Sequence, residues 1–390
     1  MSASVSTDPL YQPELWPLQP DIAHLNHGSF GAVPLPVMAV QQERRERMDA
    51  NPVGFFRREL QPSLDLARSV VGGFLGSDPL GVAFVQNTTS AASSVLAAVA
   101  LAPGDEVVVT DHVYGAVWFA VEKAALRAGA SVVSVSVPLA ASDDEVVGAV
   151  VGAVTSRTRL VVVDHISSAT AKLFPVARIV AAARERGAAV FVDAAHAPGM
   201  LPVDVGSLGA DFWAGNFHKW PCAPRGSAGF YVAPRWRDAV SSFPVGWREA
   251  EGFPHTFTQP GTADLSGWLA VPAALEFFES FGWAAVRGRN SALARYGQRV
   301  VAEALGVDLA GMPGKGTGGA GLSMRLVPLP GVPARLAAAD ALRDRIADDA
   351  RIETAINVWG GQVLLRLSAQ LYNSEAQYER LALVLREFLR

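Results

Sequence analysis

Cysteine is almost absent from the sequence, because Cys222 is the only one in 390 residues. A single thiol excludes a disulfide within the chain and a zinc site built from several cysteines, and we expect no metal site. A lone thiol fits a reducing compartment, and the first twenty residues lack the basic start and apolar run of a secretory signal peptide. We therefore expect a cytoplasmic protein.

Charge and long apolar runs are also scarce. Charged residues make up 18% of the chain, and 33 Lys and Arg stand against 37 Asp and Glu, so we expect no nucleic-acid partner. Gly, Pro or charged residues interrupt each apolar stretch before the ~20 residues that a membrane-spanning helix needs, so we expect no membrane partner either. Half of the residues are hydrophobic, which allows a large core. At ~150 residues per domain, the length predicts two or three domains.

Val-rich runs are present and alternate with Ala-rich stretches of helical periodicity. Uninterrupted apolar runs are typical of strands that are buried on both faces. Alternation of strands and helices predicts an α/β fold with a mainly parallel sheet covered by helices. We expect strands at 81–86, 106–110, 131–137, 158–165, 188–196 and 226–232.

The alternation fades after about residue 240, and helices then mix with strands. We predict an N-terminal segment over 1–25, a large α/β domain over 26–265 and a smaller α+β domain over 266–390. The segment 314–321 matches the G-x-G-x-x-G pattern of dinucleotide-binding proteins. A helix is expected before it and a strand after it, the reverse of the order that this pattern requires, so we interpret it as a loop. The alternative hypothesis that the protein is a nicotinamide-dependent oxidoreductase depends on this match alone.

Two expected strands end in a carboxylate, at Asp193 and at Asp164. Burying a carboxylate there costs free energy unless a cation or hydrogen-bond donors meet it. Either residue could instead cap a helix or lie in a loop. Open α/β sheets bind ligands at the carboxyl ends of their strands, so both positions are candidates for a site.

Lys219 lies in an apolar, aromatic stretch between His218 and Trp220. Lysine is seldom buried, and a buried lysine can have a lowered pKa and form a Schiff base. An isolated lysine would more simply keep its ammonium in water. Asp193, however, lies upstream at a strand end, and the pair of Asp and Lys is what pyridoxal 5′-phosphate (PLP) requires. The Asp keeps the pyridine nitrogen protonated, and the Lys forms the imine.

The cofactor's phosphate and ring need partners as well. The segment 86–90, QNTTS, joins an expected strand to an expected helix, where hydroxyl and free N–H groups form an anion site or simply cap the helix. Asn216 and His218 precede the lysine and could supply further donors. His112 or Tyr114, which follow another strand, could stack on the ring.

With these residues in view, the chain resembles the aminotransferase class V family of fold-type I PLP enzymes. It is most similar to isopenicillin N epimerase-like proteins, with cysteine desulfurases and C–S lyases as relatives. The motifs that carry the resemblance are spread over nearly the whole chain: 25–34, 51–60, 86–91, 110–116, 164–175, 192–199, 215–220, 261–275 and 364–374.

The resemblance implies the roles of the cofactor-binding residues. Lys219 would carry the Schiff base and later move the Cα proton, Asp193 would pair with the pyridine nitrogen, and His196 would lie beside the ring hydroxyl or ring edge. His112 would stack on the ring, with Tyr114 as the alternative. The phosphate would be held by Thr88, Thr89, Asn216 and His218.

The remaining implied roles concern the substrate and a second subunit. Arg366 would bind the substrate's α-carboxylate, and Asn26 and His27 would close over the substrate. Gly261 and Thr262 would reach a phosphate in the neighbouring subunit of a homodimer with shared active sites. The family often has Arg after this Gly-Thr pair, whereas Ala263 follows it here. This difference predicts a changed or larger substrate, or a different carboxylate geometry.

The expected reaction acts at Cα of a small-molecule amino-acid substrate. Our first hypothesis is a C–S lyase that eliminates the β-sulfur group of a cysteine S-conjugate, in secondary metabolism such as antibiotic biosynthesis. Epimerisation is the alternative and needs a second acid, which the sequence does not identify. Transaminating, decarboxylating and catalytically silent relatives are further alternatives. The catalytic cysteine of desulfurases lies in a C-terminal loop, where this chain has none, so we interpret Cys222 as structural.

Overall fold

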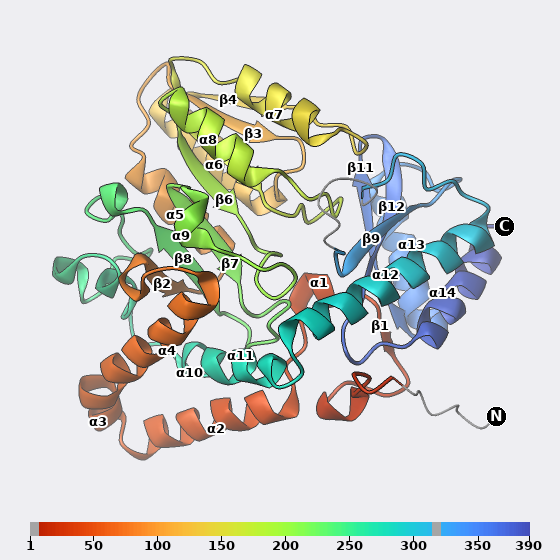
Figure 1. The fold of residues 1–390 in the computed structure, drawn as a ribbon, viewed down its shortest axis with the longest axis horizontal. Helices are drawn as coiled ribbons and strands as arrows, with labels where there is room; N and C mark the ends of the chain where they lie inside the picture. Colours follow the sequence, from red (N-terminus) through yellow and green to blue (C-terminus); the bar gives the residue numbers. More distant parts are fainter. Residues whose placement is uncertain (1–7, 314–320) are drawn as a thin grey trace.

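The structure is a computed structural model that describes residues 8–313 and 321–390. Figure 1 shows a large sheet with helices on both faces and a smaller unit of strands and helices formed by the last third of the chain. The glycine-rich segment interpreted above as a loop lies outside the described residues, apart from Gly321.

The large sheet has seven strands in the order β2-β8-β7-β6-β5-β3-β4. The five strands from β7 to β4 run parallel, and β8 is antiparallel to both of its neighbours. All six predicted strands are present, and a seventh, β7, was not predicted. The strands are β2 (Val82–Val85), β3 (Glu106–Thr110), β4 (Ser131–Val135), β5 (Thr158–Asp164), β6 (Ala189–Asp193), β7 (Phe212–Asn216) and β8 (Ala228–Val232).

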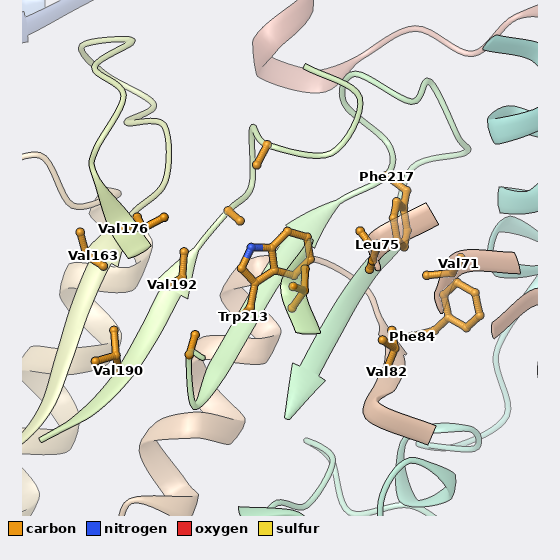
Figure 2. Close-up of a cluster of buried hydrophobic side chains, with 14 of the residues drawn as sticks. Val71, Leu75, Val82, Phe84, Val163, Val176, Val190, Val192, Trp213 and Phe217 are labelled. Atoms are coloured by element: carbon orange, nitrogen blue, oxygen red, sulfur yellow. The ribbon is translucent and has the colours of Figure 1, made fainter. Parts of the chain in front are cut away.

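Helices cover both faces of this sheet because its central strands are buried on both sides. One face packs on α5 (Thr88–Ala98) and α6 (Gly115–Ala128). The opposite face packs on α4 (Leu60–Leu75), α7 (Asp143–Gly152) and α8 (Val176–Glu185). Figure 2 shows this second core, where the Trp213 indole lies between the valines of β6 and Leu75 and Phe217.

The smaller unit contains an antiparallel sheet in the order β11-β12-β9. These strands are β9 (Met324–Pro328), β11 (Ala355–Trp359) and β12 (Gln362–Ser368), and they pack with α12 (Trp283–Leu305), α13 (Leu336–Ala350) and α14 (Glu375–Phe388). The chain's first strand, β1 (Ala23–His24), pairs in parallel with β10 (Ile352–Glu353), so the N-terminal segment joins this unit (Figure 1).

The remaining helices and turns are short or lie outside these two sets of packed elements. They are α1 (His27–Phe30), α2 (Leu35–Ala50), α3 (Pro52–Gly54), α9 (Val205–Leu208), α10 (Ser266–Leu269), α11 (Val271–Glu279), a π-turn at Phe55–Glu59 and short 3-10 turns at Pro13–Leu15, Pro79–Gly81, Pro234–Trp236, Glu249–Glu251 and His255–Phe257. Side chains of α10 and α11 belong to the core of the large sheet. The predicted division at residue 265 stays a prediction.

Within the described residues, no single helix is both long and apolar enough to cross a bilayer. The consecutive segments Ser266–Glu279 and Trp283–Leu305 reach that length and apolarity only together, and the chain bends by 77° between them.

Candidate active site

A cavity of about 310 Å³ opens at the carboxyl ends of β5, β6 and β7. Parallel strands place their last residues at one edge of a sheet, which is where open α/β sheets bind ligands. Eight residues predicted from the sequence line this cavity: Thr88, Thr89, Tyr114, Asp193, His196, Asn216, His218 and Lys219. The structure therefore brings together groups that lie up to 131 residues apart, since 219 − 88 = 131.

A larger cavity of about 430 Å³ lies beside α8 and α9 and has mainly apolar walls. Size alone would favour it as a ligand site. The smaller cavity is the better candidate, because a lysine, two carboxylates and two histidines converge there, and convergent polar groups are what orient a ligand.

Lys219 lies in the turn after β7 and is buried. Its Nζ is 3.1 Å from Nε2 of His196. Burial and the nearby Arg366 guanidinium together lower the pKa of Lys219 to about 7, against the opposing effect of Asp193 and Asp164. Near neutral pH a large share of this side chain is therefore the neutral amine, the nucleophilic form.

Asp164 and Asp193 stand opposite each other in the register of β5 and β6. Asp193 accepts a hydrogen bond from the Ala195 N–H at 3.0 Å, whereas Oδ2 of Asp164 is buried without a hydrogen-bond partner among the described residues. Burial raises the pKa of both carboxyl groups, and Asp193 raises that of Asp164 further. Two adjacent buried carboxyl groups at the cavity wall would be stabilised by a cation bound in the cavity beside them. A protonated pyridine nitrogen is such a cation.

The end of the cavity at which the phosphate is predicted to bind lies at the start of α5. Asn216 Oδ1 accepts hydrogen bonds from the N–H and the hydroxyl of Thr88, at 3.0 and 3.1 Å. This contact fixes the first turn of the helix, whose N–H groups and positive dipole end favour an anion. His218 and Arg225 line the same cavity, and Arg225 donates to the Gly31 carbonyl at 3.2 Å. Sequence reasoning missed Arg225, because a single exposed arginine carries no motif.

Arg366 of β12 is buried at 3% exposure and has no ion pair with a described carboxylate. Its guanidinium donates to the Ser168 carbonyl at 2.6 Å and to the Ser29 hydroxyl at 2.9 Å, and both serines line the cavity. Its Nε has no partner among the described residues, and burial lowers its pKa to about 10. A buried, unpaired guanidinium is the group that a substrate carboxylate would stabilise.

His112 does not lie where the resemblance implied. It is absent from the residues that line the cavity, and its ring nitrogens contact the Thr170 hydroxyl and the Val137 carbonyl, both at 2.7 Å. Its ring packs against Trp359 instead. Tyr114 precedes the first turn of α6 and lines the cavity, as does Phe30 of α1. Of the two predicted rings, Tyr114 is therefore the one available to a cofactor.

Asn26 and His27, at the start of α1, were also predicted as site residues, and their side chains lie outside the cavity wall. Nδ1 of His27 is 2.8 Å from the Tyr372 hydroxyl, and Nε2 is 2.9 Å from the Lys219 carbonyl, so His27 supports the backbone of the lysine. Asn26 accepts a hydrogen bond from Arg366 at 3.1 Å. Neither residue lines the cavity, which they were predicted to close.

Gly261 and Thr262 are exposed and line a separate cavity of about 110 Å³, which shares Gln86 with the site. Their contact with a second subunit stays a prediction. Cys222 is buried beneath the site, with Sγ 3.7 Å from Nε2 of His27. Burial raises the pKa of its thiol, which fits the structural interpretation.

This fold and site define a PLP-dependent enzyme of fold type I. The family model for aminotransferase class V matches residues 31–322, and the chain belongs to this family. It is 33% identical to isopenicillin N epimerase of Amycolatopsis lactamdurans, over 95% of this chain and 96% of the relative. It is also 33% identical to putative L-cysteine desulfhydrase 1 of Oryza sativa subsp. japonica, over 92% and 82% of the two chains.

Solved structures confirm the predicted fold. Apo cysteine desulfurase from Thermococcus onnurineus NA1 superposes with a TM-score of 0.82 at 20% identity, covering 99% of both chains. A mutant of C-DES with glycine covalently linked to its PLP cofactor superposes with a TM-score of 0.80 at 20% identity, covering 96% of this chain and 99% of that one. The predictions of an enzyme and of PLP as its cofactor are confirmed by the family.

Proposed function

We propose that this enzyme eliminates the β-sulfur substituent of a cysteine S-conjugate. The observation that carries the proposal is the position of Arg366, a buried guanidinium that lacks a carboxylate partner among the described residues and bonds two serines of the cavity wall. PLP, when bound, supplies an electron-accepting ring. The chain would then have to hold the amino acid's carboxylate and remove one proton from Cα.

The proton acceptors support elimination. Lys219 and His196 are in hydrogen-bond contact, so they form one group at one side of the cavity. Elimination needs one base at Cα: Lys219 takes the Cα proton, a Cα–Cβ double bond forms as the Cβ–S bond breaks, and the leaving thiolate takes the proton from Lys219 to become the thiol. Addition of water then gives pyruvate and ammonia. The similarity to L-cysteine desulfhydrases also supports this reaction.

Epimerisation is the second candidate, because the similarity to isopenicillin N epimerase extends over nearly the full length of both chains. It would require a second acid to return the proton to the opposite side of Cα. Tyr114 lines the cavity and is the residue we would assign to that step. Transamination and decarboxylation have no specific observation in their favour.

One experiment separates these reactions. The purified protein is incubated with L-cysteine S-conjugates in deuterated water, and thiol, pyruvate and the D-amino acid are measured. Elimination predicts thiol and pyruvate in equal amounts. Deuterated D-amino acid without pyruvate would instead establish an epimerase. Lys219→Ala is the control and should abolish either product together with the visible absorption of bound PLP.

We also propose a homodimer with shared active sites. Phe243, Val245 and Trp247 form an exposed apolar loop near Gly261 and Thr262, and the Trp247 side chain is 91% exposed. Exposed apolar groups gathered in this way are typical of protein–protein contacts. A second copy on this loop would carry its own Gly261 and Thr262 toward the phosphate end of the partner's cavity. The proposed setting is the cytoplasm and secondary metabolism such as antibiotic biosynthesis.

A further inference from the structure

Three buried side chains form a continuous hydrogen-bonded chain beneath the cavity. The indole Nε1 of Trp220 donates to Nδ1 of His196 at 3.3 Å. Nε2 of the same imidazole is 3.1 Å from Nζ of Lys219. Trp220 and His196 are 2% and 1% exposed, so the contact between these two side chains is shielded from solvent. The direction of each hydrogen bond among Trp220, His196 and Lys219 therefore depends on which nitrogen atoms of these three side chains carry protons.

The indole fixes the position of the proton on His196. An indole N–H can only donate, so Nδ1 of His196 must present its lone pair. A neutral imidazole carries one proton, which must then be on Nε2 and point at Lys219. An ammonium group has three donors and no acceptor, so Lys219 can receive this hydrogen bond only as a neutral amine.

The opposite arrangement leaves buried donors facing each other. If Lys219 were an ammonium that donated to Nε2, the imidazole proton would be on Nδ1, directed at the Trp220 N–H. The two N–H groups would then face each other across the buried contact between Trp220 and His196, which is unfavourable. A doubly protonated His196 has the same conflict. Burial also lowers the pKa of His196 well below its ordinary value, and this keeps the imidazole neutral.

The Trp220 ring cannot easily turn to avoid this constraint. It belongs to a buried apolar cluster with Ile166, Met200 and Leu201, and it packs in tilted contact with the His27 ring at 5.1 Å between centroids. Close packing of this kind fixes the rotamer and with it the direction of the N–H.

We propose that Trp220 is a positioning residue that fixes the tautomer of His196 and thereby holds Lys219 as the neutral amine. The proposal rests on the function assigned to Lys219 above, since the neutral amine is the form that condenses with an aldehyde. Trp220 itself touches neither cofactor nor substrate in this account and acts through His196.

Other charged groups also act on this pair, and they are unchanged when Trp220 is replaced. The groups that shift the pKa of Lys219 or His196 are Asp164 on β5, Asp193 on β6, Arg366 on β12, His218 beside the lysine and His27 on α1. Replacing Trp220 by Phe removes the N–H and keeps an aromatic ring in the cluster. A change in the titration of Lys219 in this variant therefore reports on the indole hydrogen bond.

The experiment titrates Lys219 in the full-length protein from which PLP has been removed. The rate of acetylation of Lys219 by acetic anhydride is followed against pH by peptide mass spectrometry, and the rate at which added PLP develops visible absorption is followed in parallel. In Trp220→Phe we expect both midpoints to rise by about one pH unit, the size of one net hydrogen bond. Side-chain ¹⁵N NMR of His196 should show the proton on Nε2 in the wild type and on Nδ1 in the variant.

Trp236→Phe is the matched control. Its indole N–H donates to Asp211 at 2.9 Å, away from the cavity, so the Lys219 midpoint should not move. An unchanged midpoint in Trp220→Phe would overturn the proposal. So would a wild-type His196 that carries its proton on Nδ1, a measurement that needs no variant to fold. Failure of PLP to attach to Lys219 would contradict the proposed function alone, because the acetylation and NMR results do not depend on it.

Discussion

Arg366 and Ser29 meet at the edge of the active-site cavity, where a terminal nitrogen of the guanidinium donates to the serine hydroxyl at 2.9 Å. The contact joins β12 of the smaller unit to α1, the short helix after the N-terminal segment. A substrate carboxylate bound here would therefore be held by parts of the chain that are 337 residues apart.

Replacing Arg366 by Met should weaken the recognition of amino acids. We expect kcat/KM to fall about 100-fold, because two charge-assisted hydrogen bonds are lost. The absorption of bound PLP should be unchanged. The control is the corresponding amine substrate without a carboxylate, whose turnover should be the same in both proteins. An equal loss for the amine would mean that Arg366 maintains the structure of the site instead.

Asp164→Asn should change the pH dependence of stability in the protein without PLP. The pKa of Asp164 is raised in the folded state, so its contribution to stability is fully present below about pH 4 and is lost as pH rises through the raised pKa. The variant lacks this titration. Above neutral pH we expect it to be more stable by about 2 kcal/mol, the cost of a buried unpartnered group. Thermal unfolding from pH 4 to 9 measures the difference, and parallel profiles would contradict it.

His112 and Tyr114 should differ in their effects when replaced. Tyr114→Leu removes an aromatic ring from the cavity wall and should weaken PLP binding about tenfold, whereas Tyr114→Phe should retain the wild-type affinity. His112→Gln breaks buried contacts with Thr170 and Val137 and should lower the free energy of unfolding by about 1–3 kcal/mol without this loss of affinity. PLP titrations and denaturant unfolding give both quantities. A larger affinity loss for His112→Gln would restore the role that the resemblance implied.

Cys222→Ala should retain the rate of thiol and pyruvate formation within about twofold, because a buried thiol with a raised pKa is a poor nucleophile. The same variant should form no less product when a sulfur acceptor is supplied. A loss of more than tenfold in turnover, with PLP still bound, would show that the thiol carries sulfur.

Trp247→Ser should shift the protein from dimer to monomer, since it replaces an exposed aromatic side chain in the proposed contact by a small polar one. Sedimentation across a concentration series measures the dissociation constant, for which we expect a rise of about 30-fold, or ~2 kcal/mol. Leu383→Ser, another exposed apolar residue on α14, is the control and should leave the dimer intact. A wild-type protein that sediments as a monomer would refute the proposal.

Local patterns predicted most of the fold. Val-rich runs identified six of the seven strands of the large sheet, because strands that are buried on both faces must be apolar throughout. The missing strand, Phe212–Asn216, contains no β-branched residue, and its residues FWAGN do not form such a run. Its position between β6 and β8 becomes apparent only from the pairing of the sheet.

The candidate site was predicted in its chemistry and only partly in its geometry. Asp193 and Lys219 were identified because one is a carboxylate at the end of a buried strand and the other is a lysine among aromatic residues. Burying a charged group at either position costs free energy, so both positions are unusual. Asp164 was identified for the same reason, but nothing in the neighbouring sequence showed that it would pair with Asp193 in the register of β5 and β6. His112 and Tyr114 are two residues apart, and the backbone turn between them decides which ring lines the cavity.

The sequence by itself determined the α/β alternation, the family and the residue types needed to hold PLP, because periodicity and unusual polar positions are properties of short segments. Tertiary structure decided which ring lines the cavity, that His27 supports the lysine backbone from behind, and that Trp220, His196 and Lys219 form one proton-bearing chain. These relationships depend on hydrogen-bond directions between distant segments. Such directions exist only once packing has fixed the rotamers.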